Sequence, residues 1–217
     1  MMIELYVFLP SPRCFKPMAI ANHLGLDWAP RIIDLTKGDQ KTPQFAALNP
    51  NMRVPTMKDG NYILWESNAI CQYLALQRPE SGLMPKDDLV RIDVARWQFW
   101  DLAHWGPCCV PLIGEYVIKP HVMKTGEPDM AAVAKGTDLF HSAAKILDGE
   151  LKGKQFVTGN TLTVADFSLG AMLNYAGMAH FPLEPYAEIR RWFATLSALP
   201  AWQKTVTQTA LPAAIPA

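Results

Sequence analysis

Short apolar runs alternate with helix-spaced apolar positions in the first third of the chain. Residues 3–9 and residues 28–35, the second run centred on residues 32–33, are rich in β-branched and aromatic side chains, which is typical of buried strands. The segment between them has helical spacing, ends at Gly25 and tolerates Pro17 only in its first turn. A crossover of this length suits parallel strands, so the opening pattern predicts a strand, helix, strand unit.

A hairpin and a closing helix follow this unit. Residues 43–48 have the pattern of a short helix. Residues 54–58 and residues 62–65 flank an Asp-Gly-Asn turn, which predicts two antiparallel strands. Residues 67–76 again have helical spacing, and after them proline, glycine and serine interrupt the pattern.

The pattern then changes to helices alone. The clearest helix start is the Thr-Val-Ala-Asp motif at residues 163–166, because Thr163 and Asp166 suit a capping box. The expected apolar helix faces are formed by Leu89, Ile92, Arg96, Phe99, Trp100 and Ala103, by Phe140, Ala143, Ala144, Leu147 and Leu151, and by Ile189, Trp192, Phe193 and Leu196. The tail at residues 210–217, rich in proline and alanine, is expected to fray or to lie across the surface.

These elements predict an α/β domain followed by an all-α domain. The first domain would span residues 1–78 in the order βαβαββα, a linker residues 79–86, and a helical bundle residues 87–217.

Composition and charge narrow the possible function classes. The 217 residues include 20 Lys and Arg against 20 Asp and Glu, so the formal charge is zero, and a 50% hydrophobic content suffices for two cores. A neutral chain without a basic run lacks the electrostatic footprint of a dedicated binder of nucleic acid or of anionic membranes. No apolar run approaches the ~20 residues of a membrane span, and the amino terminus lacks the features of a secretory signal, which predicts a cytoplasmic protein.

Cysteine, histidine and glycine patterns narrow the chemistry further. The four cysteines are too few for a disulfide framework and are expected to be thiols. The five histidines are scattered and none has metal-ligand spacing, so we expect no metal. No glycine-rich phosphate motif follows the first strand, which excludes the nucleotide-binding interpretations of such an opening.

Four short motifs, in their order and approximate spacing, resemble those of the cytosolic glutathione S-transferases. They are Ser-Pro-Arg-Cys at residues 11–14, Val-Pro at residues 54–55, Glu-Ser at residues 66–67 and Thr-Val-Ala-Asp at residues 163–166. The resemblance covers nearly the whole chain and is strongest to the theta and phi classes. It implies a thioredoxin-like first domain, an all-helical second domain, a cytoplasmic homodimer, and conjugation of glutathione to small hydrophobic electrophiles, as in detoxification.

The resemblance also implies how glutathione would bind. A cis Pro55 would turn the backbone of Val54 outward, so that its N–H and C=O pair with the cysteinyl unit of the tripeptide. The amide and hydroxyl of Ser67, at a helix start, would hold the γ-glutamyl carboxylate, and Glu66 would support the same end of the ligand. The implied contacts of the glycyl carboxylate are Gln40, Lys41 and Arg53.

Ser11 is the implied catalytic residue. A free thiol with a pKa of about 8.5 is mostly protonated at neutral pH, and a hydroxyl that donates to sulfur raises the fraction of reactive thiolate. One such bond is worth roughly 1.5–3 kcal/mol, or about one to two pKa units. Cys14 is expected to be a buried packing residue, but it also stays open as the alternative nucleophile of a glutathione-dependent thiol transferase or peroxidase.

The second domain is implied to carry the pocket for the electrophile. Residues 97–109 are dense in aromatic side chains, which we expect to lie mostly in the bundle core. The candidates for second-substrate contacts in this segment are His104, Trp105 and Cys108. Asp101 resembles the acid that reaches across the dimer to the glutathione amine. Pro107 and Pro111 should kink or end the helix.

A binding or adaptor protein that kept this scaffold and lost turnover is the other open interpretation. Pro12 and Pro17 bracket the predicted catalytic loop, and the basic residue usual shortly after Cys14 is represented only by Lys16. An isomerase of the zeta class is disfavoured, because its Ser-Ser-Cys-Ser-Trp-Arg motif is absent.

Overall fold

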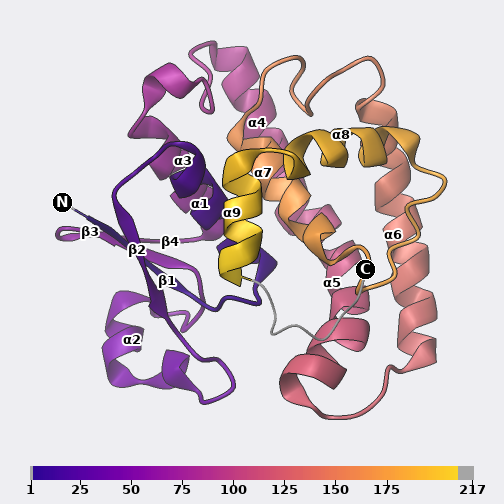
Figure 1. Cartoon of the computed structure of the whole chain (residues 1–217), viewed down its shortest axis with the longest axis horizontal. Coiled ribbons are helices and arrows are strands. Elements are labelled where there is room, and N and C mark those ends of the chain that lie inside the picture. The colour runs from indigo at the N-terminus through magenta and orange to yellow at the C-terminus, as the bar shows by residue number, and fades with distance from the viewer. Residues whose placement is uncertain (1, 210–217) are drawn as a thin grey trace. The chain divides into compact units, whose positions relative to one another are not determined.

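The structure, a computed structural model, describes residues 2–209, and the predicted tail at residues 210–217 lies outside the described residues. The chain forms two compact units (Figure 1). The first unit runs up to Met84 and also includes the segment from Ala198 that carries the last helix, and the second unit runs from Pro85 to Ser197.

A four-stranded mixed sheet lies at the centre of the first unit. The strands are β1 (Ile3–Val7), β2 (Trp28–Ile32), β3 (Thr56–Asp59) and β4 (Tyr62–Trp65), in the order β2-β1-β3-β4. β1 pairs parallel with β2 and antiparallel with β3, and β3 pairs antiparallel with β4. The predicted parallel opening and the predicted hairpin are both confirmed.

Three α-helices complete the predicted βαβαββα order of this unit. They are α1 (Pro12–His23), α2 (Pro43–Leu48) and α3 (Ser67–Leu76), with short 3₁₀ turns η1 (Asp39–Lys41) and η2 (Pro79–Ser81). α1 packs against α3, and the unit's core is made of fully buried side chains such as Leu5, Ile20, Met57 and Leu74. The thioredoxin-like arrangement is therefore present.

The last helix, α9 (Pro200–Thr209), packs against α1 within the first unit (Figure 1). The rings of Phe15 and Trp202 lie with their centroids 4.8 Å apart. The side-chain amide nitrogen of Asn22 donates a hydrogen bond to the Thr205 hydroxyl at 2.8 Å. The sequence pattern, which assigned all later helices to one bundle, did not predict this placement.

The second strand is shorter than predicted. β2 ends at Ile32, whose side chain is 53% exposed, so a strand centred on residues 32–33 is wrong. The physical reason is that its pairing partner β1 ends at Val7, which lies opposite Ile32. Pro30 fits inside β2 because β2 is an edge strand, where one row of backbone groups needs no partner strand.

The first helix starts earlier than Pro17 suggested. α1 begins at Pro12, so Pro17 lies in its second turn rather than its first. Pro12 has the favoured first-turn position for proline, which sets this start. The predicted stop is confirmed, because the helix ends at His23 and Gly25 has a left-handed φ of 59°.

The second unit is helical throughout its described part, apart from loops and one isolated bridge. Its α-helices are α4 (Asp88–Trp100), α5 (Gly106–Ile113), α6 (Met130–Glu150), α7 (Val164–Gly170) and α8 (Ala187–Ser197). Two π-helical segments, η3 (Asp101–Trp105) and η4 (Gly114–Met123), and the 3₁₀ helix η5 (Ala171–Tyr175) connect some of them. Within residues 2–209, no helix has the length and apolarity to cross a membrane.

The predicted face of α6 is buried, and so is that of α8 apart from the half-buried Phe193, but that of α4 is not. Leu89, Ile92 and Phe99 are 78%, 66% and 71% exposed. The helix buries Val94 and Trp97 instead. Trp97 decides the orientation, because its large ring is enclosed and its indole N–H donates to a backbone carbonyl over 3.1 Å. α4 therefore carries apolar side chains on two faces, one of which faces outward.

Prolines in this unit do not end the helix. The chain stays helical from Asp88 through Met123, with the π-helical segments η3 and η4 on either side of α5. Pro107 and Pro111 were expected either to kink or to end the helix, and the second alternative is wrong because the helix continues past both. Wider π turns re-route the backbone hydrogen bonds, as at Gly106, whose N–H donates to the carbonyl of Asp101.

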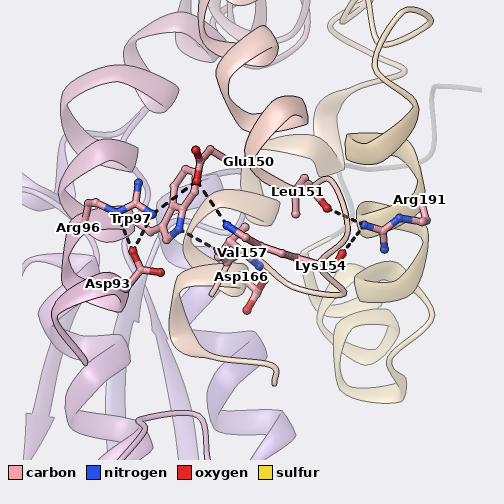
Figure 2. A network of polar contacts seen from close by, with 9 residues as sticks. All are labelled: Asp93, Arg96, Trp97, Glu150, Leu151, Lys154, Val157, Asp166 and Arg191. Atoms are coloured by element: carbon pink, nitrogen blue, oxygen red, sulfur yellow. Dashed lines mark hydrogen bonds and ion pairs between the residues drawn. The ribbon is translucent and has the colours of Figure 1, made fainter. Parts of the chain in front are cut away.

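A buried carboxylate ties α7 to its surroundings. Asp166 Oδ1 accepts hydrogen bonds from the Val157 amide at 3.0 Å and the Trp192 indole at 2.9 Å. Its Oδ2 accepts from the Thr163 amide at 2.9 Å and hydroxyl at 3.2 Å, which confirms the predicted capping box. The same loop residue, Val157, accepts from the Trp97 indole through its carbonyl (Figure 2).

Candidate functional site

Three of the four motifs lie at the same end of the sheet, where β1 and β4 end and β3 begins. Tyr6, near the end of β1, lies opposite Thr56 at the start of β3, and Thr56 also lies opposite Trp65 at the end of β4. The segments after β1, before β3 and after β4 therefore leave the sheet on the same side. These are the segments that carry residues 11–14, 54–55 and 66–67.

Ser11 is the N-cap residue of α1. Its backbone is extended, with φ −92° and ψ 121°, and its carbonyl accepts from the amides of Cys14 and Phe15 at 3.0 Å each. Its own amide donates to the Phe8 carbonyl at 2.9 Å. The backbone thus holds the turn, and the half-buried hydroxyl makes no capping bond. The hydroxyl lies at the positive end of the helix, where an anion is favoured.

Cys14 is enclosed in the core of the first unit. Its side chain is fully buried, and burial raises the pKa of its thiol to about 12, against smaller lowering effects that include the Ser11 hydroxyl and the charge of Lys16. A thiol with this pKa is protonated at neutral pH and is a weak nucleophile. The structure therefore favours the packing interpretation over the alternative nucleophile.

The Val54-Pro55 peptide bond is cis, as the resemblance implied. Within the described residues, the N–H and C=O of Val54 make no backbone hydrogen bond. An extended peptide can pair with such groups as with a strand edge.

Asn49 holds the loop that contains Val54 and Pro55 through hydrogen bonds, and it was not predicted as a site residue. It is buried, and its side-chain amide donates to the Arg53 carbonyl at 2.8 Å and to the Thr56 hydroxyl at 3.0 Å. The signal in the sequence is a polar amide at the end of a helix just before Pro50. The guanidinium-bearing Arg53 itself is exposed.

The start of α3 offers an anion site. Glu66 is its N-cap residue, with a positive φ of 73°, and Ser67 is the first helical residue and is buried. The first amides of a helix have no carbonyl partner within that helix and attract anions. Glu66 is exposed beside them. This donor set fits a carboxylate.

Gln40 and Lys41 lie in the turn η1 between β2 and α2. The side-chain oxygen of Gln40 is buried and has no hydrogen-bond partner among residues 2–209, whereas Lys41 is exposed. An amide with an unused acceptor next to a free-standing cation fits a peptide end that carries an N–H and a carboxylate.

In the second unit, Asp101 is fully buried, on the same side of the helix as Val94, Trp97 and Gln98. This burial disfavours the expected cross-dimer role of Asp101, which stays a prediction.

The three pocket candidates differ in exposure. Trp105 belongs to the core: it is fully buried, donates through its indole to the Leu169 carbonyl at 2.9 Å and packs on Phe140. Cys108 is buried too, and burial raises the pKa of its thiol. His104 is exposed, with its ring near that of Trp100. His104 is thus the candidate open to a ligand.

Comparisons with known proteins agree with this geometry. Residues 1–76 match the family "Glutathione S-transferase, N-terminal domain" and residues 130–195 match "Glutathione S-transferase, C-terminal domain". The chain is 31% identical over 201 residues to "Glutathione S-transferase 2" of Anopheles gambiae, with 91% of each chain covered. It is 29% identical to "Glutathione S-transferase 3" of Zea mays, with 97% of this chain and 96% of the relative covered.

Solved structures show the same fold. The apo structure of glutathione S-transferase III superposes with a TM-score of 0.86 at 27% identity, covering 99% of this chain and 100% of that one. A delta-class glutathione transferase of Nilaparvata lugens superposes with a TM-score of 0.82 at 30% identity, covering 96% and 94%. With sequence relatives, both domain families and the fold in agreement, the chain belongs to the glutathione S-transferase family.

Proposed function

We propose that this enzyme conjugates the thiolate of glutathione to small hydrophobic electrophiles, with Ser11 as the group that stabilises the thiolate. The observation that carries the proposal is that Ser11, the unpaired backbone of Val54 and the start of α3 converge at the same end of the sheet. The three features match the thiol, the peptide backbone and the γ-glutamyl carboxylate of glutathione.

Each end of the tripeptide has a partner in this arrangement. The cysteinyl unit pairs with the backbone of Val54, and the γ-glutamyl carboxylate lies at the amide and hydroxyl of Ser67, near Glu66. The glycyl end contacts Gln40, Lys41 and Arg53. In this pose the ligand is fixed at both ends, and the sulfur lies at the amino end of α1.

The chemical step follows from the position of the Ser11 hydroxyl. The bound thiol releases its proton to solvent, and the hydroxyl donates a hydrogen bond to the sulfur anion, aided by the positive end of α1. The sulfur then forms a bond to the electrophilic carbon, whose leaving group departs or whose π bond accepts the electron pair. His104 is the exposed side chain that we assign to the electrophile.

Titration of bound glutathione tests the role of Ser11. In the wild-type protein, the ultraviolet absorbance of the thiolate should show ionisation at least about one pH unit below that of free glutathione, because the Ser11 hydroxyl and α1 stabilise the anion. In Ser11→Ala most of this shift should disappear.

Cys14→Ala is the matched control, because it removes a neighbouring sulfur that the structure buries. It should retain both the shift and conjugation. A wild-type protein that binds glutathione with its thiol still protonated would contradict the proposal, and loss of activity in Cys14→Ala would restore the alternative nucleophile.

We also propose a homodimer that buries the outward apolar face of α4, formed by Leu89, Ile92 and Phe99. Three large apolar side chains in one exposed stripe are costly in water and are typical of an interface. Phe99→Glu should shift the protein from dimer to monomer in sedimentation velocity runs. Ile146→Glu, at an exposed apolar position of α6, should leave the dimer intact, and a wild-type monomer would refute this part of the proposal.

We place the enzyme in the cytoplasm. All four cysteines are free thiols in the structure, and a reducing compartment keeps them so. Cell fractionation, which measures the compartment that contains the enzyme, tests this location.

A further inference from the structure

Lys16 is a buried cation in the middle of the first unit. It lies in α1, and only 1% of its surface is exposed. Lysine is rarely enclosed to this degree without polar partners, because removing its charge from water costs free energy. A methionine or leucine would fill the same space without that cost, so packing alone does not account for this residue.

The ammonium group of Lys16 donates a hydrogen bond to the side-chain oxygen of Asn68. Asn68 is the second residue of α3 and is itself buried, directly after Ser67. The charge of Lys16 thus lies behind the amino end of α3, where it adds to the positive end of the helix. It also reaches the start of α1, because it acts to lower the pKa of Cys14, although burial outweighs it.

We propose that Lys16 is a positioning residue for glutathione: through Asn68 it fixes the start of α3, and its buried charge strengthens binding of the γ-glutamyl carboxylate at Ser67. This inference rests on the proposed function. In the proposed pose Lys16 acts on Ser67 through Asn68, the next residue of α3, and not by contact with the ligand. Its effect is electrostatic, and a charge enclosed in protein acts on an anion more strongly than a solvated surface lysine does.

Lys16 is the one basic residue shortly after Cys14, where the family pattern has its usual basic residue, and this departure favoured a non-catalytic adaptor. Its burial against α3 instead connects it to the carboxylate end of the substrate.

Two ligands separate an electrostatic role from a merely structural one. The first is glutathione, and the second is 4-aminobutyryl-cysteinylglycine, which lacks only the α-carboxylate of the γ-glutamyl unit. Calorimetry with Lys16→Met should show glutathione binding weakened about tenfold, because a charge–charge attraction is lost, and binding of the analogue nearly unchanged. Equal weakening of both ligands would show that Lys16 acts only on the fold, and unchanged affinity for both would overturn the inference as well.

Asn68→Asp provides a second variant that keeps the lysine in place. The new carboxylate pairs with Lys16 and cancels its charge, so the same selective loss of glutathione affinity is expected, even if Lys16→Met does not fold. Lys16→Arg keeps the charge and should bind glutathione within a few-fold of the wild type. Lys86→Met, at an exposed lysine, should change neither affinity.

The outcomes also separate this inference from the function on which it rests. If the wild-type protein binds neither ligand, the glutathione site itself is wrong. A different outcome is that the wild type binds glutathione while Lys16→Met and Asn68→Asp keep the wild-type ratio of the affinities for glutathione and for the analogue. The glutathione site then stands, and the role of Lys16 is refuted.

Discussion

Replacing Glu66 and Ser67 together by alanine is expected to weaken glutathione binding by about 100-fold or more. The double variant removes the hydroxyl at the start of α3 and the carboxylate beside it, which we propose as the side-chain partners of the charged γ-glutamyl end. Hydrogen bonds to charged groups are worth about 1.5–3 kcal/mol each, so the loss of two, about 3 kcal/mol or more, exceeds a factor of 100. Calorimetric titration with glutathione measures it, with circular dichroism to check the fold.

The chain offers a matched control in its other Glu-Ser pair. Glu80 and Ser81 lie in the exposed turn η2, and replacing both by alanine makes the same chemical change away from the site. This control should bind glutathione as the wild type does. Unaltered affinity in the Glu66 and Ser67 variant would mean that the carboxylate binds elsewhere, and the orientation proposed for glutathione would have to be abandoned.

Asp166→Asn is expected to lower the free energy of unfolding by about 2–4 kcal/mol at neutral pH. The carboxylate of Asp166 accepts four hydrogen bonds from buried donors of Val157, Trp192 and Thr163. An asparagine can keep the two bonds at Oδ1, but its NH₂ group then faces the Thr163 amide. One buried donor is left without an acceptor, and charge-assisted bonds are lost. Chemical denaturation measures the difference.

The difference in the free energy of unfolding between the wild type and Asp166→Asn also depends on pH. Burial, partly offset by the four donors, raises the pKa of Asp166 to about 6, above the value of about 3.9 in an unfolded chain. The folded protein therefore binds the proton more tightly, so this contribution to stability is full below about pH 4 and is lost as the pH rises through about 6. The stability difference between wild type and Asp166→Asn should shrink over that interval and stay constant above it.

Asp138→Asn makes the same substitution at an exposed position of α6 and should change stability by no more than about 0.5 kcal/mol. If Asp166→Asn unfolds at the same denaturant concentration as this control, the buried carboxylate does not hold the loop, α7 and α8 together as described.

Elements with a strong local pattern could be predicted from the sequence. The hairpin around Gly60, the helix over residues 67–76 and the capping box at Thr163 each depend on residues close together in the chain, and the structure confirms them. The motifs of the site share this property, since each occupies one turn or one helix start.

Features that depend on distant partners could not be predicted. The exposed apolar face of α4 has the same periodicity as a buried one, and only the enclosure of Trp97 decides which face points inward. Asp101 and Trp105 have side chains suited to a ligand site, but packing from other helices encloses them. The burial of Lys16 likewise depends on α3, which lies 52 positions further along the chain at Asn68.

The docking of α9 on α1 means that the helical unit is an insertion within the first one. The first unit is discontinuous, because its final piece is encoded at the far end of the described chain. During synthesis, the sheet and α1 leave the ribosome long before Trp202 is available to cover Phe15. The first unit is therefore completed last, although its translation begins first.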